Sequence, residues 1–234
     1  MIPIRDDAPR YSTPWINYFL IALNTLVFLY ELQLGPRNLN AFVFTFGMVP
    51  AHVATAVHTG AFTAGIVPIL TSMFMHAGWL HIIFNMWWLW IFGDNVEDSL
   101  GHFPYLIFYL LSGLGAATVH ILFNWGSRVP SVGASGAIAG VMGAYFVLFP
   151  SARVLTLVPF FFIFFTWLPA WLILGYWFVL QFLSGAATSI TSVQRTANSG
   201  GIAFWAHVGG FVTGVVMIKL FPRRAPRYHS RAWQ

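Results

Sequence analysis

One serine and one histidine lie in settings where serine chemistry could occur. Ser135 lies in the sequence GASG, at the start of an apolar run that ends at Pro150. His207 lies in FWAHVGGFVTG, within another apolar run. A serine nucleophile needs a neighbouring base, and a helix that begins at Ser135 would favour negative charge there through its free N–H groups and dipole. The two residues are therefore a candidate catalytic dyad.

Further polar residues lie in or beside apolar segments. His81 and Asn85 in HIIFN are four positions apart, so a helix would place them on one face. His76 precedes that segment, and His120 and Asn124 end the next one. Taken singly, each is more often a packing residue or a hydrogen-bond partner between helices. Polar groups within membrane spans are costly, however, and this makes them functional candidates.

Composition excludes several other chemistries. The chain has no Cys, no HExxH sequence and no acidic residue in the middle of an apolar run. A thiol nucleophile, the usual zinc-protease helix and an aspartyl protease are therefore excluded. Asp94 would lie ~20 Å along a helix from His81, which is too far for a Ser-His-Asp triad. His76, His81 and His207 have no carboxylate or Cys ligand beside them, so we expect no metal and no cofactor.

The composition indicates an integral membrane protein. Of the 234 residues, 58% are hydrophobic and 7% are charged, whereas a soluble domain carries ~25% charged residues. A lipid bilayer must therefore solvate the surface. The net charge of +5 does not indicate nucleic acid binding, because the basic residues are few and scattered. Nothing resembles an organelle transit peptide, so we expect a cell or inner membrane.

The apolar segments predict an all-α bundle of six transmembrane helices. A helix needs ~20 apolar residues to cross the hydrocarbon core, and breaks such as GPRN, GDNVEDSLGH and WGSRVPS separate the segments. We expect one six-span domain, 15–221, between an N-terminal segment, 1–14, and a basic tail, 222–234. The predicted spans are residues 15–33, 77–95, 103–124, 134–149, 156–183 and 201–221.

Lysine and arginine predict the orientation, because cytoplasmic loops carry an excess of them. Six spans place both termini on one side, which would hold eight Lys and Arg residues against three on the other. We therefore expect cytoplasmic termini. The eight are Arg5, Arg10, Arg153, Lys219, Arg223, Arg224, Arg227 and Arg231, and the three are Arg37, Arg128 and Arg195.

Two segments are unusual for such a bundle. The fourth predicted span is only ~24 Å long against a ~30 Å hydrocarbon core, so its outer end would begin ~6 Å below the surface. The loop before it must then enter the membrane, which is tolerated only where backbone is buried in protein or lines a wet cavity. The first loop, 34–76, is long and apolar, and we expect it to lie in the outer interface as short amphipathic helices.

Depth and packing bring the candidate residues together. The depth of each residue below the outer surface follows from its position along its helix, and it is ~6 Å for His81, ~12 Å for Asn85 and ~9 Å for His207. These depths are close to the ~6 Å at which the fourth span begins, next to Ser135. Stripes of small residues beside the dyad would let the fourth and sixth spans approach closely. The stripes are formed by Gly136 and Gly140 and by Gly210 and Gly214.

Four motifs in order resemble one known family. MFMHAGW followed by HIIFN, then GDNVEDSLG, GASG and AHVGGFVTG, are together similar to the rhomboid intramembrane serine proteases over residues 68–221. The resemblance implies a six-span fold. It also implies cleavage of transmembrane segments of other proteins near their outer ends, often after small residues.

The resemblance implies roles for the matching residues. Ser135 would be the nucleophile, and His207 the general base and later the acid. Asn85, His81 and the Ser135 backbone N–H would form the oxyanion hole. Three further residues would have supporting roles. Gly133 would shape the loop, His76 would support the first loop, and Glu97 would help to structure an inner loop.

This chain departs from the family pattern at two places. Some members carry a tyrosine, stacked on the catalytic histidine, four residues after the nucleophile, where this chain has Ala139. The resemblance therefore does not say what orients His207. The Trp-Arg pair that some members carry in the first loop is also not visible.

Other functions stay open at this point. A non-catalytic six-span protein could use the polar layer to bind or escort transmembrane helices, and a small-solute channel is a third option. The aromatic segment from Phe160 to Trp171 indicates a lateral gate for substrate helices, although a tilted lipid-facing helix is the commoner explanation of such a run.

Overall fold

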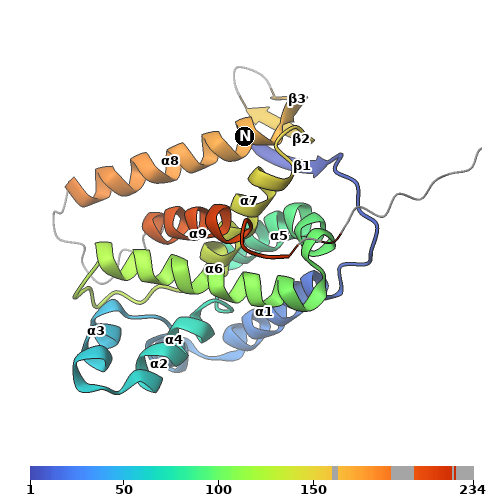
Figure 1. The fold of residues 1–234 in the computed structure, drawn as a ribbon. Helices are drawn as coiled ribbons and strands as arrows, with labels where there is room; N and C mark the ends of the chain where they lie inside the picture. The colour runs from blue at the N-terminus through green and yellow to red at the C-terminus, as the bar shows by residue number, and fades with distance from the viewer. Residues whose placement is uncertain (160–162, 191–202, 223, 225–234) are drawn as a thin grey trace, which may run out of the picture.

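The computed structural model describes residues 1–159, 163–190, 203–222 and 224. This part of the chain is mostly helical, with one small sheet (Figure 1). The strands are β1 (Ile2–Asp6), β2 (Arg153–Pro159) and β3 (Ile163–Pro169). The helices are α1 (Trp15–Gln33), α2 (Pro36–Phe46), α3 (Pro50–Thr59), α4 (Phe62–Ser72), α5 (Trp79–Leu100), α6 (His102–Phe123), α7 (Ser135–Leu148), α8 (Ala170–Ile190) and α9 (Phe204–Met217).

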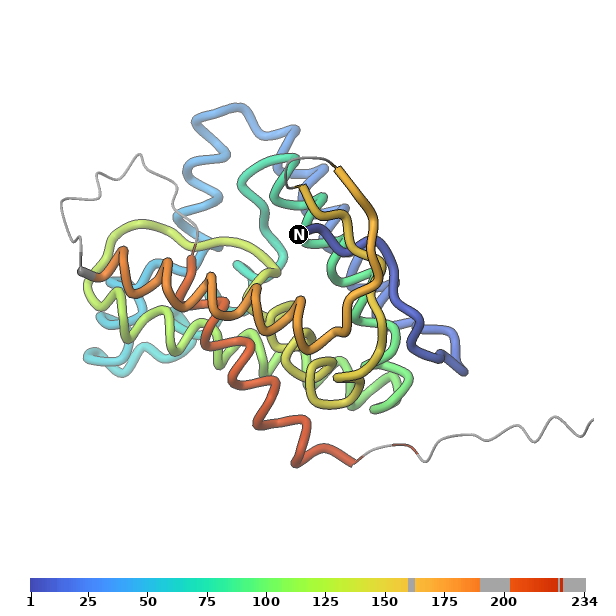
Figure 2. The backbone as a smooth tube through the Cα atoms, turned by 90° about the horizontal axis from the view of Figure 1, so that it is seen from above, coloured from blue at the N-terminus to red at the C-terminus, as the bar shows by residue number. Residues whose placement is uncertain are grey.

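Helix α7 lies at the centre of the bundle, in contact with α5, α6, α8 and α9 (Figures 1 and 2). Its sequence SGAIAGVMGAYFVL is apolar on every side, as expected of a helix surrounded by others. All residues from 136 to 145 are buried. Packing on several sides therefore fixes the position of Ser135, the first residue of this helix.

The outer helices have the length and composition of membrane spans. Helices α1 and α6 and residues Ala170–Ser189 of α8 are long and apolar enough to cross a membrane, while α4, α7 and α9 are apolar but shorter. Large apolar side chains are exposed on these helices, including Trp15 at 64%, Phe103 at 70% and Leu183 at 56%. Such a surface needs lipid around it, and the chain is a helical membrane protein.

Helices lie at five of the six predicted spans, with ends that differ by a few residues. The predicted end of the second span is wrong, because α5 continues to Leu100 through the acidic stretch that was expected to be a loop. The buried carboxylate of Glu97 explains the difference. It accepts hydrogen bonds from the backbone N–H groups of Ile16 at 3.0 Å and Asn17 at 2.7 Å, at the start of α1.

The predicted fifth span, 156–183, is wrong over its first half, and the fold is not all-α. Strands β2 and β3 form an antiparallel hairpin, and α8 begins only at Ala170. A continuous apolar run does not distinguish a strand from a buried helix by periodicity. Here its β-branched and aromatic residues favour strands, and the N-terminal segment supplies a strand partner, β1.

The predicted gate over Phe160 to Trp171 falls largely on this hairpin. Residues 160–162 lie outside the described part of the chain, and 163–169 form β3. A helical gate at these positions is therefore wrong.

The sheet ties the N-terminal segment to the bundle in the strand order β1-β2-β3. Asp6 accepts a hydrogen bond from the hydroxyl of Tyr145 on α7, and Asp7 accepts from the backbone N–H of Arg153 at 2.7 Å and from its Nε at 2.9 Å. The backbone N–H of Arg153, together with its guanidinium, holds the pKa of Asp7 below its ordinary value. Burial raises the pKa of Asp6.

The first loop forms three helices, α2, α3 and α4, in agreement with the expectation of short helices. They hold the loop that enters α7. Met48 and Ser131 exchange backbone hydrogen bonds of 3.1 and 2.8 Å, and the N–H of Gly133 donates to the carbonyl of Ser72 at 2.9 Å. The backbone before α7 is therefore hydrogen-bonded to the first loop and to the end of α4 on one side and lines the cavity on the other, which are the settings that irregular backbone within a membrane requires.

Candidate active site

A glycine with a special backbone conformation leads the chain into α7. Gly133 has a φ of 136°, a region that side-chain-bearing residues rarely adopt. A Cβ atom at this position would stand 2.7 Å from Nε2 of His81 and 3.6 Å from Oγ of Ser135. Glycine is therefore required by conformation and by space, and it lets the imidazole and the hydroxyl lie beside the same loop.

The backbones of α7 and α9 touch at their small residues. A Cβ atom on Gly210 would lie 1.9 Å from the carbonyl oxygen of Gly136, and one on Gly214 would lie 1.9 Å from that of Gly140. No side chain larger than hydrogen fits at these crossings. The predicted stripes thus bring α9 close enough for His207 to reach the start of α7.

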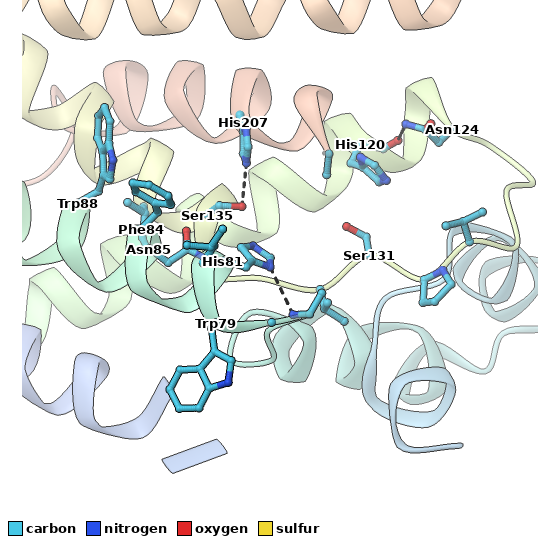
Figure 3. A pocket seen from close by; sticks show the side chains of 18 of the residues that line it. Trp79, His81, Phe84, Asn85, Trp88, His120, Asn124, Ser131, Ser135 and His207 are labelled. Atoms are coloured by element: carbon cyan, nitrogen blue, oxygen red, sulfur yellow. Dashed lines mark hydrogen bonds between the residues drawn. The ribbon is translucent and has the colours of Figure 1, made fainter. Parts of the chain in front are cut away.

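The predicted pair is in hydrogen-bond contact (Figure 3). Nε2 of His207 lies 2.8 Å from Oγ of Ser135. His207 is only 9% exposed, and the first N–H groups of α7 have no partner within that helix. A hydroxyl that donates to an imidazole at a helix N-terminus is the arrangement from which a serine can be deprotonated and attack.

The other nitrogen of His207 faces α8. Its Nδ1 lies 2.8 Å from Oε1 of Gln181, and the ring of Trp177, one turn earlier, lies 5.6 Å from the imidazole with a tilt of 37°. Sequence reasoning missed both residues. The available signal was the amide of Gln181 within the apolar run WFVLQFL, because a polar residue inside a span is a functional candidate.

Helix α5 contributes the predicted donors from the opposite side (Figure 3). His81 and Asn85 line the same cavity as Ser135. The buried Nδ2 of Asn85 has no hydrogen-bond partner in the described part of the chain. Nδ1 of His81 accepts from the backbone N–H of Ala77 at 3.4 Å, so the neutral ring carries its proton on Nε2. Two side-chain N–H groups are therefore available to a bound oxygen.

The supporting residues lie behind this layer. His76 packs against His81 with ring centroids 5.1 Å apart, and its backbone N–H donates to the carboxylate of Glu31 at 3.1 Å. This contact ties the end of the first loop to α1. Glu97 lies far from the cavity, in α5 rather than in the inner loop where it was expected, and fastens α5 to α1.

A cavity of about 850 Å³ opens over the dyad. The loop before α7 lines one side of it, as the sequence predicts for a wet cavity, and residues of α5, α7, α8, α9 and the end of α6 line the other sides. At the end of α6, Nδ2 of Asn124 donates to the carbonyl of His120 at 2.8 Å. The remaining wall is rich in aromatic rings, including Trp79, Phe84, Trp88 and Trp177.

The fold and this cavity define a helical membrane protein with a serine and a histidine in contact inside the bundle. Residues 63–224, more than half of the chain, match the family model described as the Rhomboid domain. The chain therefore belongs to the rhomboid family, which includes intramembrane proteases.

Curated relatives carry the same family name. The chain is 35% identical over 132 residues to Rhomboid protease GluP of Bacillus subtilis, covering 56% of this chain and 24% of that protein. It is 32% identical over 161 residues to Rhomboid-like protein 11, chloroplastic, of Arabidopsis thaliana, covering 66% and 52%. It is 30% identical over 155 residues to Rhomboid protein 1, mitochondrial, of Saccharomyces cerevisiae, covering 64% and 40%. The chain thus spans about a quarter to a half of the length of these relatives.

Proposed function

We propose that this protein is an intramembrane serine endopeptidase that uses Ser135 and His207 as a catalytic dyad. The observation that carries the proposal is the 2.8 Å contact between Oγ of Ser135 and Nε2 of His207, at the first residue of a helix and on the wall of a cavity. Family membership supports it, since one relative is named a rhomboid protease.

The proposed reaction has two stages, the acylation and the deacylation of Ser135, and His207 carries a proton in each. Oγ of Ser135 attacks the peptide carbonyl carbon while its proton moves to Nε2 of His207. The imidazolium then gives this proton to the departing amine, and an acyl ester remains on Ser135. A water molecule from the cavity then attacks the ester carbonyl carbon while Nε2 takes its proton. The bond to Oγ breaks, the imidazolium returns the proton to Oγ, and the new carboxyl end is released.

The attacked carbonyl oxygen becomes an oxyanion, which needs donors already aimed at it. Nδ2 of Asn85, Nε2–H of His81 and the backbone N–H of Ser135 are the candidate donors, and the unpaired state of the Asn85 amide supports this role. Gly133 and His76 would have supporting roles, because one leaves room for His81 and the other packs against it.

The substrates we propose are transmembrane segments of other membrane proteins, cleaved near their outer ends. In this proposal α1, α5, α6, α7, α8 and α9 are the six spans of one domain, 15–221, in a cell or inner membrane. The segments 1–14 and 222–234 face the cytoplasm, although most of the second lies outside the described residues. The aromatic cavity wall suits an apolar segment better than a polar one.

Single substitutions of the dyad test the proposal. Purified wild-type protein should cleave a model transmembrane substrate and react with a fluorophosphonate probe. Ser135→Ala should abolish both reactions, and His207→Ala should lower the cleavage rate by ~10³-fold or more. The exposed residues Ser151 and His52 provide matched controls, and Ser151→Ala and His52→Ala should retain activity.

The alternative function predicts a different result. A folded wild-type protein that neither cleaves nor reacts with the probe, yet retains transmembrane segments on purification, would be a non-catalytic helix-binding protein. Near-normal cleavage by Ser135→Ala would also contradict the proposal.

A further inference from the structure

Gln181 is a polar side chain of α8 that touches the His207 ring from the side opposite Ser135. Its Oε1 lies 2.8 Å from Nδ1 of His207. We propose that Gln181 is the positioning residue of the dyad, and that it holds His207 in the tautomer and ring orientation that leave Nε2 free to take the Ser135 proton. This inference rests on the proposed function, because it concerns the same base.

The contact with Gln181 decides which ring nitrogen of His207 carries the imidazole proton. A neutral imidazole has one N–H and one lone pair, and a base for Ser135 must keep its lone pair on Nε2, which lies 2.8 Å from Oγ. The proton must then be on Nδ1. The amide oxygen of Gln181 accepts a hydrogen bond from that N–H and so stabilises the competent tautomer. The other tautomer would present an N–H to the hydroxyl and could not accept its proton.

On the α7 side, position 139, four residues after Ser135, is a fully buried alanine, which carries no ring or polar group that could orient the imidazole. The contacts that orient the His207 ring come instead from α8, where Gln181 binds Nδ1 and Trp177 packs against the ring.

Two substitutions at one position separate the hydrogen bond from the volume of the side chain. Gln181→Met keeps the length of the side chain but offers only a weak acceptor, while Gln181→Glu keeps a strong acceptor. We expect kcat to fall about 10- to 100-fold in Gln181→Met with little change in KM. Gln181→Glu should recover most of that loss.

A matched control comes from another contact between α8 and α9. Oγ of Ser189 accepts a hydrogen bond from Nε1 of Trp205 at 3.0 Å and does not touch His207. Ser189→Ala therefore removes an α8–α9 hydrogen bond while the Gln181 contact stays. We expect kcat and KM of Ser189→Ala to stay close to the wild-type values. An equal loss of kcat in Ser189→Ala and Gln181→Met would reduce Gln181 to a tether between helices.

A spectroscopic measurement tests the tautomer without using activity. In ¹⁵N-histidine-labelled protein, the His207 signals are identified by their absence in His207→Ala. Wild-type protein should show a protonated Nδ1 and an unprotonated Nε2, and Gln181→Met should show a mixture of tautomers. The inference would be overturned if the wild-type protein carried the imidazole proton of His207 on Nε2. It would also be overturned if Gln181→Met left both the His207 tautomer and kcat unchanged. A protein that lacks fluorophosphonate labelling but has the Nδ1–H tautomer would instead contradict the proposed function alone.

Discussion

At the scale of single residues, the site places the imidazole of His207 and the side-chain N–H groups of Asn85 and His81 around the hydroxyl of Ser135. His207 is satisfied on both ring nitrogens, by Ser135 and by Gln181. Asn85 is the opposite case, since its buried Nδ2 has no partner in the described part of the chain. A buried amide without a partner is costly, and that cost is explained if a substrate oxygen completes the hydrogen bond during the reaction.

Asn85→Ala tests this explanation. If the amide only bridges helices, the substitution should lower thermal stability and leave kcat of the folded protein intact. If it donates to the oxyanion, kcat should fall ~10²–10³-fold with little change in melting temperature. Because Ser135 stays in place, labelling by a fluorophosphonate should persist in part. We expect the second result, with both quantities measured on the same sample.

Asn124 is the matched control for Asn85. It lines the same cavity, but its Nδ2 already donates to the carbonyl of His120 in the last turn of α6. Asn124→Ala should therefore leave kcat within about threefold of wild type, because no donor to the reacting oxygen is lost. A comparable loss of kcat in both variants would indicate a general change of the cavity rather than a specific role for Asn85.

The contact between Ser135 and His207 was predictable from the sequence, whereas the contact between His207 and Gln181 was not. GASG and AHVGGFVTG carry local signals, and helix rise alone placed Ser135 and His207 at similar depth. The contact with Gln181 depends on the distance and rotation of α8 relative to α9, which no local pattern encodes. Its only signal in the sequence was a single amide in an apolar run.

At the scale of elements, the contact between Ser135 and His207 depends on how closely α7 and α9 pack. Their backbones meet where Gly210 faces the carbonyl of Gly136, with no space for a methyl group. The GxxxG pattern predicted this approach because small residues allow backbones to meet. The hairpin of β2 and β3 was not predictable in the same way, because its strand partner is the N-terminal segment, more than a hundred residues away in sequence.

Gly210→Ala should separate these two helices. The new methyl group would lie 1.9 Å from the Gly136 carbonyl oxygen, so α9 must shift and take His207 with it. We expect kcat to fall about 100-fold, since a displacement of about 1 Å has that effect on positioned catalytic groups. The melting temperature should also fall.

Gly175 on α8 is the control for the substitution itself. A Cβ there would meet nothing nearer than 3.9 Å, so Gly175→Ala should keep wild-type kcat and gain up to about 1 kcal/mol of helix stability. Equal kcat in Gly210→Ala and wild type would show that the close helix crossing is not needed for the dyad.

At the scale of the whole molecule, the two ends of the bundle differ in character. One end carries the cavity, the dyad and the first-loop helices. The other carries the sheet and a polar strap in which Arg10 pairs with Asp94 at 3.1 Å and the backbone N–H of Tyr11 donates to Asp98 at 3.0 Å. Because charged side chains are costly inside a bilayer, we propose that the strap lies at an aqueous interface and that the membrane lies between the two ends.

Basic residues indicate which end is cytoplasmic. In the described part of the chain, the strap end holds five Lys and Arg residues and the cavity end holds two. From the positive-inside rule we propose that the strap faces the cytoplasm and the cavity faces the outer surface. The five are Arg5, Arg10, Arg153, Lys219 and Arg224, and the two are Arg37 and Arg128.

The absence of cysteine from the sequence makes this orientation directly measurable. Thr59, at the end of α3, and Ser151, between α7 and β2, are both exposed and lie at opposite ends of the bundle. In intact cells, a maleimide that cannot cross membranes should label Thr59→Cys and leave Ser151→Cys unmodified until the cells are lysed, because only the first thiol would face outward. The wild-type protein should stay unlabelled under both conditions.

Labelling of Ser151→Cys alone in intact cells would reverse the orientation and place the cavity in the cytoplasmic half of the membrane. Equal labelling of both variants would show that the charge difference does not fix a single orientation. In either case, cleavage at the outer ends of transmembrane segments would no longer follow from the position of Ser135.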